Sequence, residues 1–160
     1  ALPGQKLVLG FTGPTRCGKG RLVRMLAEML EAERGWSVSA GQIEVIGQDD
    51  FWRRCVSIVL PDGETVKSEE EAECHDFGAF QSAIQTAVAK KDAKVVVVEG
   101  FTIIHDPRVA QCCDHIFLLN VDRENTVARR SARNANNPNP LPVSVCESIV
   151  WPAHERYLAR

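Results

Sequence analysis

The chain of 160 residues is 44% hydrophobic and 25% charged, with a formal net charge of −2. This length fits one domain with its own core, and the small negative charge excludes a large nucleic-acid footprint. No apolar run approaches the length of a membrane span, so we expect neither nucleic acid nor membrane as a partner.

Apolar runs with strand character alternate along the chain with patterns of helical spacing. We expect strands at 6–11, about 43–47, 94–99 and 115–121, and helices near 20–34, 77–90, 123–133 and 145–158. The alternation predicts an α/β fold of three layers, with helices on both faces of a parallel sheet of about five strands. We see no repeat or linker and expect a single domain over 1–160.

Local signals mark some helix boundaries. Asp76 and Asp122 stand where a side chain caps the helix that follows, and Ser144 opens a capping box before the last helix. Pro152 is expected to kink or interrupt that last helix, because proline lacks the backbone N–H that a helix needs.

Two segments lack a regular pattern. Residues 61–75 contain Pro61-Asp62-Gly63 and then the acidic run Glu69–Glu71, and we expect a turn followed by a solvated loop. Residues 134–142 are rich in Asn and Pro and are expected to form a mobile flap.

A glycine-rich loop follows the first predicted strand and opens the first predicted helix. Strand, loop and helix in this order bind a nucleotide triphosphate, because backbone amides and the helix N-terminus surround the phosphates. Lys19 is placed to reach the β- and γ-phosphates. The next residue is Gly20, where a Ser or Thr hydroxyl would ligate Mg²⁺. We expect ATP to contact Gly13, Pro14, Thr15, Arg16, Cys17, Gly18, Lys19, Gly20 and Arg21.

Acidic residues follow two of the predicted strands. Asp49 and Asp50 come after the second strand, and Glu99 comes directly after a run of four valines. Parallel strands present ligands at their carboxyl ends, where phosphoryl transfer needs a carboxylate base and Mg²⁺ ligands. We therefore expect Asp49 and Glu99 to be catalytic together with Lys19, and to hold Mg²⁺ beside ATP. For Asp49 and Asp50, a role in a turn or helix cap is an equal alternative.

An arginine cluster lies on the predicted helix at 123–133. Arg129 and Arg133 are four residues apart and Arg130 and Arg133 three apart, so these cations lie close together. Guanidinium groups match phosphate oxygens, which predicts an anion clamp. The alternative is an ordinary solvated basic face.

The six cysteines form no Cys-x-x-Cys pair, and Cys112 is adjacent to Cys113. Adjacent cysteines make a poor disulfide framework, so we expect reduced thiols and a cytoplasmic location.

In their order along the chain, these motifs resemble the nicotinamide riboside kinases, within the wider uridine-kinase-like group of P-loop kinases. The resemblance spans nearly the whole chain and implies one kinase domain, with a substrate-binding insertion at about 48–76 and a lid at about 129–143. It rests on the phosphate loop, Gln48-Asp49-Asp50-Phe51-Trp52, His75-Asp76, Val98-Glu99-Gly100-Phe101, Arg129-Arg130-Ser131-Ala132-Arg133 and Val150-Trp151-Pro152.

The resemblance also implies roles for individual residues. Asp49 matches the base that accepts the proton of the ribose 5′-hydroxyl, and Asp76 matches the carboxylate that holds the ribose hydroxyls. Arg129 and Arg133 match lid arginines on the ATP phosphates. The implied substrate-binding residues are Asp49, Asp50, Phe51, Trp52, His75, Asp76 and Arg130.

The implied activity transfers the ATP γ-phosphate to nicotinamide riboside, which gives nicotinamide mononucleotide for NAD synthesis. The partners are then ATP and a small nucleoside. One alternative is a uridine or cytidine kinase, which needs a different base pocket. Another is a catalytically weak nucleotide-binding regulatory protein, for which Gly20 is the best support.

Overall fold

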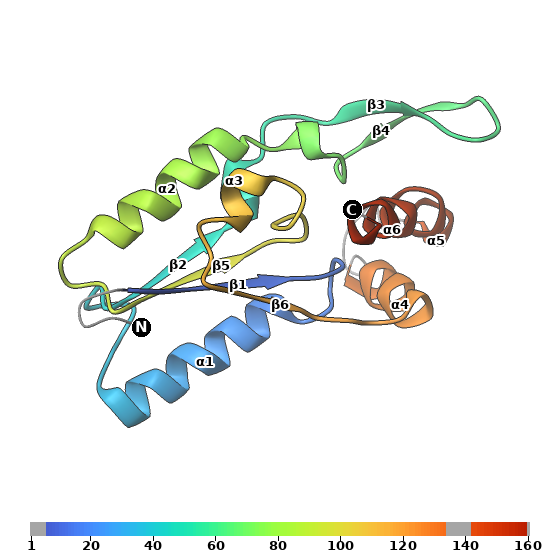
Figure 1. Ribbon diagram of the computed structural model, residues 1–160. Helices are drawn as coiled ribbons and strands as arrows, with labels where there is room; N and C mark the ends of the chain where they lie inside the picture. The colour runs from blue at the N-terminus through green and yellow to red at the C-terminus, as the bar shows by residue number, and fades with distance from the viewer. Residues whose placement is uncertain (1–5, 134–141, 160) are drawn as a thin grey trace.

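The computed structural model describes residues 6–133 and 142–159 (Figure 1), so the predicted flap lies outside the described residues except for Pro142. In chain order the elements are β1 (Leu7–Thr12), α1 (Lys19–Arg34), β2 (Ile43–Gly47), η1 (Gln48–Phe51), β3 (Val56–Val59), β4 (Thr65–Ser68), η2 (Ala72–Cys74), α2 (Phe77–Ala89), β5 (Val95–Glu99), α3 (Pro107–Ala110), β6 (His115–Leu118), α4 (Arg123–Arg133), α5 (Val143–Val145), η3 (Cys146–Val150) and α6 (Trp151–Leu158).

The main sheet has four parallel strands in the order β2-β5-β1-β6. Val8 of β1 pairs with Val96 of β5, and Leu9 pairs with His115 of β6. α1 covers one face of the sheet, while α2 and α3 cover the other (Figure 1). The predicted three-layer α/β fold is confirmed. The two further strands of the described chain, β3 and β4, form a separate antiparallel hairpin.

β5 is buried on both faces because its neighbours and two helix layers enclose it. The side chains of Val95, Val96, Val97 and Val98 are at most 3% exposed. Successive residues of a strand point to opposite faces. Val96 and Val98 therefore enter the core beneath α2, and Val95 and Val97 enter the core against α1. Four β-branched residues in a row suit this position, and they bring Glu99 to the edge of the sheet.

The core beneath α2 depends on Phe80, which is fully buried and stacks on Phe51 with a centroid distance of 5.0 Å. Replacing Phe80 with Ala is expected to lower the free energy of unfolding by about 3–5 kcal/mol, because the large cavity has no neighbour to fill it. Urea unfolding followed by circular dichroism measures this. Phe117→Ala removes the same ring from a side chain that is 48% exposed on β6. Equal losses in the two variants would contradict the core assignment.

The prediction for residues 61–75 as a turn and solvated loop is wrong beyond the turn. The segment contains all of β4 and all of η2, and the hairpin of β3 and β4 extends from the body of the molecule (Figure 1). Glu70, inside the acidic run, is only 8% exposed. A run of carboxylates looks solvated in sequence, whereas here the C-terminal helix packs over it.

The helix boundaries agree with the predictions in part. The Asp76 carboxylate accepts a hydrogen bond from the Ala79 N–H at 2.9 Å, and Asp122 accepts one from the Asn125 N–H at 2.8 Å, so both caps are confirmed. The capping box at Ser144 is wrong, because α5 begins one residue earlier. Pro152 does not end the helix: a π-helical turn over Cys146–Val150 precedes it and relieves the missing N–H.

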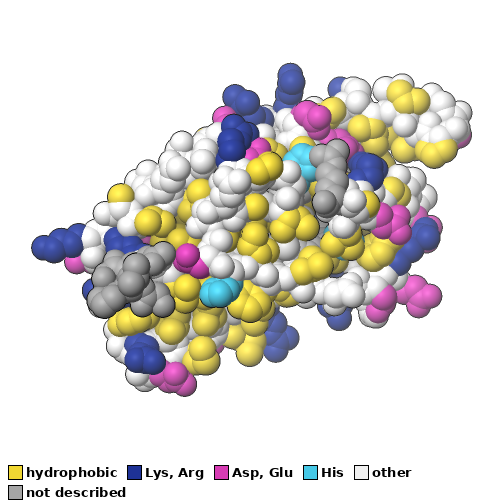
Figure 2. Space-filling view, viewed as in Figure 1, with side chains coloured by type: hydrophobic (Ala, Val, Ile, Leu, Met, Phe, Trp, Pro, Cys, Tyr) yellow, Lys and Arg dark blue, Asp and Glu magenta, His cyan; other side chains and the backbone are white. Residues whose placement is uncertain are grey.

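The surface shows hydrophobic side chains among charged ones, with apolar groups over the edge where β6 lies (Figure 2). Phe117 and Leu118 contribute there, about half exposed. In the described ranges, no helix combines the length and the apolar character that crossing a membrane requires. All six cysteines are free thiols, as predicted.

Candidate functional site

The phosphate loop joins β1 to α1 and needs glycine at two places. Gly13 has a φ of 145°, and a Cβ there would lie 2.4 Å from the Leu119 backbone oxygen. Gly18 has a φ of 107° and immediately precedes α1. The Lys19 ammonium donates hydrogen bonds to the backbone oxygens of Gly13, at 3.0 Å, and Pro14, at 2.9 Å. The loop therefore curls around the ammonium in the way that a phosphate site requires.

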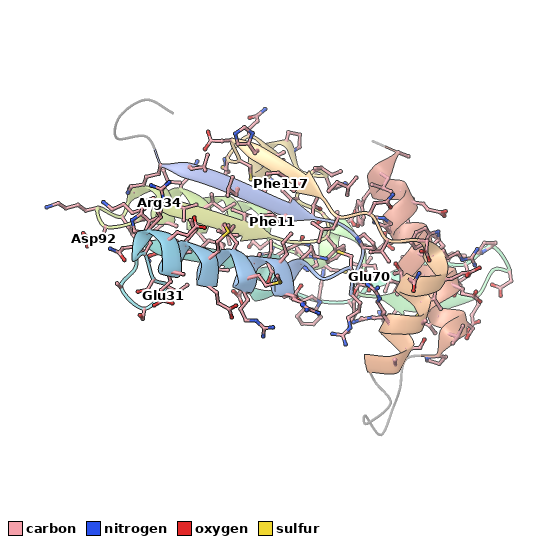
Figure 3. The ribbon with its side chains drawn as sticks, turned by 90° about the horizontal axis from the view of Figure 1, so that it is seen from below. Phe11, Glu31, Arg34, Glu70, Asp92 and Phe117 are labelled. Atoms are coloured by element: carbon pink, nitrogen blue, oxygen red, sulfur yellow. The ribbon has the colours of Figure 1, made fainter. Side chains whose placement is uncertain are left out.

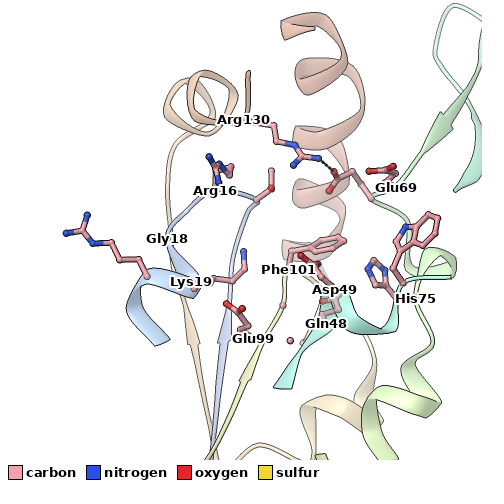
Figure 4. A pocket seen from close by; sticks show the side chains of 17 residues that line it. Arg16, Gly18, Lys19, Gln48, Asp49, Glu69, His75, Glu99, Phe101 and Arg130 are labelled. Carbon is pink, nitrogen blue, oxygen red and sulfur yellow. Dashed lines mark ion pairs between the residues drawn. The ribbon is translucent and has the colours of Figure 1, made fainter. Parts of the chain in front are cut away.

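A cavity of about 760 Å³ opens beside this loop at the carboxyl ends of the strands (Figure 4). Its cationic lining comes mainly from the loop and α1, and its anionic lining from η1, from the acidic run after β4 and from the end of β5, where Glu99 lies beside Lys19 (Figure 4). The charged residues are Arg16, Lys19, Arg21 and Arg130 on the one hand and Asp49, Glu69, Glu70 and Glu99 on the other. Such a division suits a polyanion on one side and a hydroxyl acceptor on the other.

Asp49 and Glu99 lie on neighbouring strand ends. Asp49 belongs to η1, directly after β2, and Gly47 of β2 pairs with Glu99 of β5. The Gln48 side-chain oxygen accepts a hydrogen bond from the Thr102 N–H at 3.0 Å and so ties the two strand ends together. Gly100 makes this possible, since a Cβ there would lie 2.3 Å from the same oxygen. The sheet thus presents both carboxylates to one cavity.

The electrostatics of Glu99 reflect this crowding. Burial raises the pKa of the Glu99 carboxyl, Lys19 opposes the rise, and the charge of Asp49 adds to it. The ammonium of Lys19 thus partly offsets the negative charge that the two carboxylates bring to the cavity.

The donor set fits Mg²⁺ that arrives with a nucleotide. The described residues contain no group of three or more His, Cys, Asp or Glu that could hold a metal alone. Mg²⁺ in kinases is held by one or two carboxylates plus substrate phosphates and water, and Asp49 and Glu99 are carboxylates of this kind. At Gly20 a Cβ would lie 3.5 Å from Glu99 Oε2, so the Glu99 carboxylate stands beside the place of the missing hydroxyl.

An aromatic wall closes the other end of the cavity. Trp52 and His75 form an isolated antiparallel β-bridge, and the rings of His75 and Phe101 meet edge to face at 5.4 Å. Burial lowers the pKa of His75 and so favours the neutral ring. Trp52 is half exposed and His75 is buried. These rings form a surface on which a planar base can stack.

The cavity brings together some of the predicted residues and leaves others aside. Predicted residues that line it are Thr15, Arg16, Gly18, Lys19, Gly20, Arg21, Asp49, Trp52, His75, Glu99 and Arg130. Phe51 instead packs on Phe80, and Asp76 caps α2 and meets Arg53 at 3.4 Å. Asp50 and Arg129 are exposed away from the described lining, and the Arg133 side chain lies outside the described residues. The roles of all these residues stay predictions.

Sequence reasoning missed Gln48, Glu70 and Phe101 as parts of the site. Gln48 had a signal in the sequence, because it is a polar residue directly after an apolar strand. In the structure it is 1% exposed, and its side chain bonds to the Thr102 N–H. Glu70 had none, since it is one of three consecutive glutamates. Burial raises the pKa of Glu70 to about 7, against the opposing effect of Arg130.

Relatives of known name are distant. No protein-family model matches the sequence. A chloroplastic uridine/cytidine kinase of Arabidopsis thaliana is 25% identical, in an alignment that covers 82% of this chain and 30% of that protein. A candidate uridine-cytidine kinase of Caenorhabditis elegans is 22% identical, with 94% and 71% covered. The chain therefore spans less than a third of the Arabidopsis protein.

Solved structures resemble the fold over nearly its whole length. A candidate fructose transport system kinase from Silicibacter sp. TM1040 matches with a TM-score of 0.68 at 16% identity and covers 97% of this chain and 85% of its own. A candidate uridine kinase from Bacillus stearothermophilus matches with a TM-score of 0.61 at 16% identity, with 96% and 82% covered.

These likenesses support the wider uridine-kinase-like group and not the narrower resemblance to nicotinamide riboside kinases, which none of these four proteins is named as. The likeness to the two solved structures, with TM-scores of 0.68 and 0.61, is a likeness of fold. The chain has the three-layer α/β fold of the P-loop kinases.

Proposed function

We propose that this chain is an ATP-dependent nucleoside kinase that phosphorylates the 5′-hydroxyl of uridine or cytidine. The observation that carries the proposal is that Lys19 of the phosphate loop and Asp49 of η1 line one cavity, with Glu99 at the strand end between them (Figure 4). Asp49 in this cavity is a carboxylate that can accept the proton of an acceptor hydroxyl, a task that a protein which only binds nucleotide does not have.

Each side of the cavity has its own task in this proposal. The phosphate loop binds the ATP phosphates through backbone amides, and the Lys19 ammonium moves from its loop carbonyls to the β- and γ-phosphates. Asp49 accepts the proton of the acceptor hydroxyl as that oxygen attacks the γ-phosphorus and the bond to ADP breaks. Trp52 and His75 position the base of the acceptor.

Mg²⁺ bound with ATP neutralises the charge that develops on the transferred phosphoryl group. Asp49 and Glu99 are the residues that would hold it. Exclusion of water from the cavity would favour transfer over hydrolysis of ATP.

Two acceptors deserve comparison because different observations favour them. The names of the relatives favour uridine and cytidine. The lining favours nicotinamide riboside in one respect: its pyridinium ring is cationic, and the carboxylates of Glu69 and Glu70 lie on the same side of the cavity as Trp52.

An ADP-release assay with Mg²⁺ and ATP tests the proposal by comparing uridine, cytidine and nicotinamide riboside at equal concentration. Because the relatives are named as uridine/cytidine kinases, we expect turnover with uridine or cytidine at least about tenfold above that with nicotinamide riboside. Preference for nicotinamide riboside would reverse the choice of acceptor and keep the chemistry. ATP binding without turnover on any of the three would support the regulatory alternative.

A further inference from the structure

The acidic run between β4 and η2 is fixed to the C-terminal helix. The Tyr157 hydroxyl donates to the Glu70 backbone oxygen at 2.5 Å, and the Arg156 guanidinium donates to both oxygens of the Glu71 carboxylate at 2.8 and 2.9 Å. The Ser68 hydroxyl accepts from the Glu70 N–H at 3.1 Å. These contacts leave the Glu70 backbone little freedom, so its side chain is presented to the cavity from a rigid support (Figure 3).

Inside the cavity Glu70 meets Arg130 of α4. Arg130 Nη2 lies 3.7 Å from Glu70 Oε1, and the two side chains are 17% and 11% exposed (Figure 4). This distance is beyond the 2.7–2.9 Å or so of a charge-assisted hydrogen bond, so the pair is held by charge more than by bonding geometry. Of the cationic side chains that line the cavity, Arg130 is the one that comes from α4.

The ion pair with Glu70 leaves hydrogen-bond donors of Arg130 unfilled. A guanidinium has five donors, and the Nε–H of Arg130 is buried and has no hydrogen-bond acceptor in the part of the chain that the structure describes. Burying a guanidinium with unfilled donors costs free energy of folding. A ligand that fills those donors when it binds recovers this cost. A phosphate group offers several strong acceptors to one guanidinium, whereas Glu70 makes one long contact.

We propose that the Glu70 carboxylate is a counter-ion at the position on Arg130 where a nucleotide phosphate binds, and that the phosphate displaces it. The pair Glu70–Arg130 exists while the cavity holds no nucleotide. When ATP binds, Arg130 turns to the phosphate oxygens, and the buried Glu70 carboxylate takes up one proton from solvent. This inference rests on the proposed nucleotide site but not on the identity of the acceptor.

The direction of proton transfer follows from the groups that face Glu70. Burial raises its pKa to about 7, the charges of Glu69, Asp49 and Glu71 raise it as well, and Arg130 alone lowers it. Tyr157 faces only its backbone oxygen. When phosphate takes Arg130, the lowering effect is lost and a new anion is added, so the pKa of Glu70 rises further. A group whose pKa rises on binding takes up protons when the solution pH lies between its two pKa values.

Calorimetric titration of the whole chain with Mg²⁺ and ATP, without acceptor, tests the exchange. Binding enthalpies at about pH 7.5 in two buffers of different ionisation enthalpy give the number of protons taken up. We expect about 0.7 proton for the unchanged protein, because a carboxyl with a pKa of about 7 is roughly three-quarters ionised there. Glu70→Gln is expected to reduce the uptake to near zero and to tighten ATP binding about tenfold, since the competing anion is gone.

Glu69→Gln is the matched control. It removes the same charge from the adjacent residue, which lines the cavity but forms no ion pair with Arg130 in the described structure. Its proton uptake should persist and be somewhat larger than that of the unchanged protein, because loss of the Glu69 charge lowers the pKa of Glu70 and leaves more of that carboxyl ionised before ATP binds. Weaker ATP binding by Glu70→Gln, or undiminished proton uptake, would overturn the exchange and leave the proposed kinase function intact. Failure of the unchanged protein to bind ATP would overturn the proposed function and the exchange together.

Discussion

Replacing Asp49 with Asn is expected to lower the turnover number about a thousandfold and to leave the dissociation constant of ATP within about threefold of its value. Asn has the shape of Asp but cannot accept the proton of the acceptor hydroxyl. Asp49 lies in η1 and not in the phosphate loop, and Asn keeps a side-chain oxygen that can face Mg²⁺ beside Glu99, so ATP binding is little affected. Steady-state kinetics and ATP titration of the same protein measure the two quantities.

Asp50→Asn is the comparison that isolates the role of Asp49. It changes the same charge one residue along the same short helix, but the Asp50 carboxylate does not belong to the described lining of the cavity. We expect a loss of less than about tenfold, expressed mainly in KM. If Asp49→Asn retained full turnover, or if both variants lost activity equally, Asp49 would not be the base.

Lys19→Ala is expected to weaken ATP binding about a hundredfold and to lower the turnover number by a similar factor. The ammonium makes two hydrogen bonds to loop carbonyls, which it can exchange for phosphate oxygens. Its charge acts on bound ATP and still more on the transition state. Fluorescence titration with an ATP analogue and initial-rate kinetics give the two effects separately.

The loop contacts of Lys19 require a check on stability. Loss of both hydrogen bonds loosens the loop, so the thermal midpoint of Lys19→Ala has to be measured beside its kinetics. Arg24→Ala removes a cation from the same helix, where Arg24 is exposed and faces Glu28. That variant should bind ATP like the unchanged protein. Unaltered kinetics in Lys19→Ala would remove the phosphate loop from the site.

The parts of the fold that were predictable have local causes. The phosphate loop requires glycine at Gly13 and Gly18 for backbone reasons that appear in the sequence itself. The four consecutive valines of β5 predict a strand that is buried on both faces. Asp76 and Asp122 cap helices that begin within three residues of them. In each case the physical cause lies within a few residues of its effect.

The parts that were not predictable depend on partners far away in the chain. Thr65–Ser68 forms a strand because β3 pairs with it, although the segment is short and half of its residues are exposed. Glu70 is buried because Tyr157 of α6 and Arg130 of α4 contact it. Nothing in three consecutive glutamates distinguishes the middle one. The choice of acceptor has the same difficulty, because Trp52 and His75 supply flat surfaces that many bases fit.

The position of β1 in the sheet affects how the chain folds while it is synthesised on the ribosome. β1 is synthesised before both of its neighbours in the sheet, β5 and β6, with Val8 beside Val96 and Gly10 beside Ile116. β1 therefore stays an unpaired apolar strand until β5, at Val95–Glu99, has emerged. Pairing across such sequence distance is slow. The phosphate loop, which hangs from the end of β1, gains its final shape late, so nucleotide cannot assist the early stages of folding.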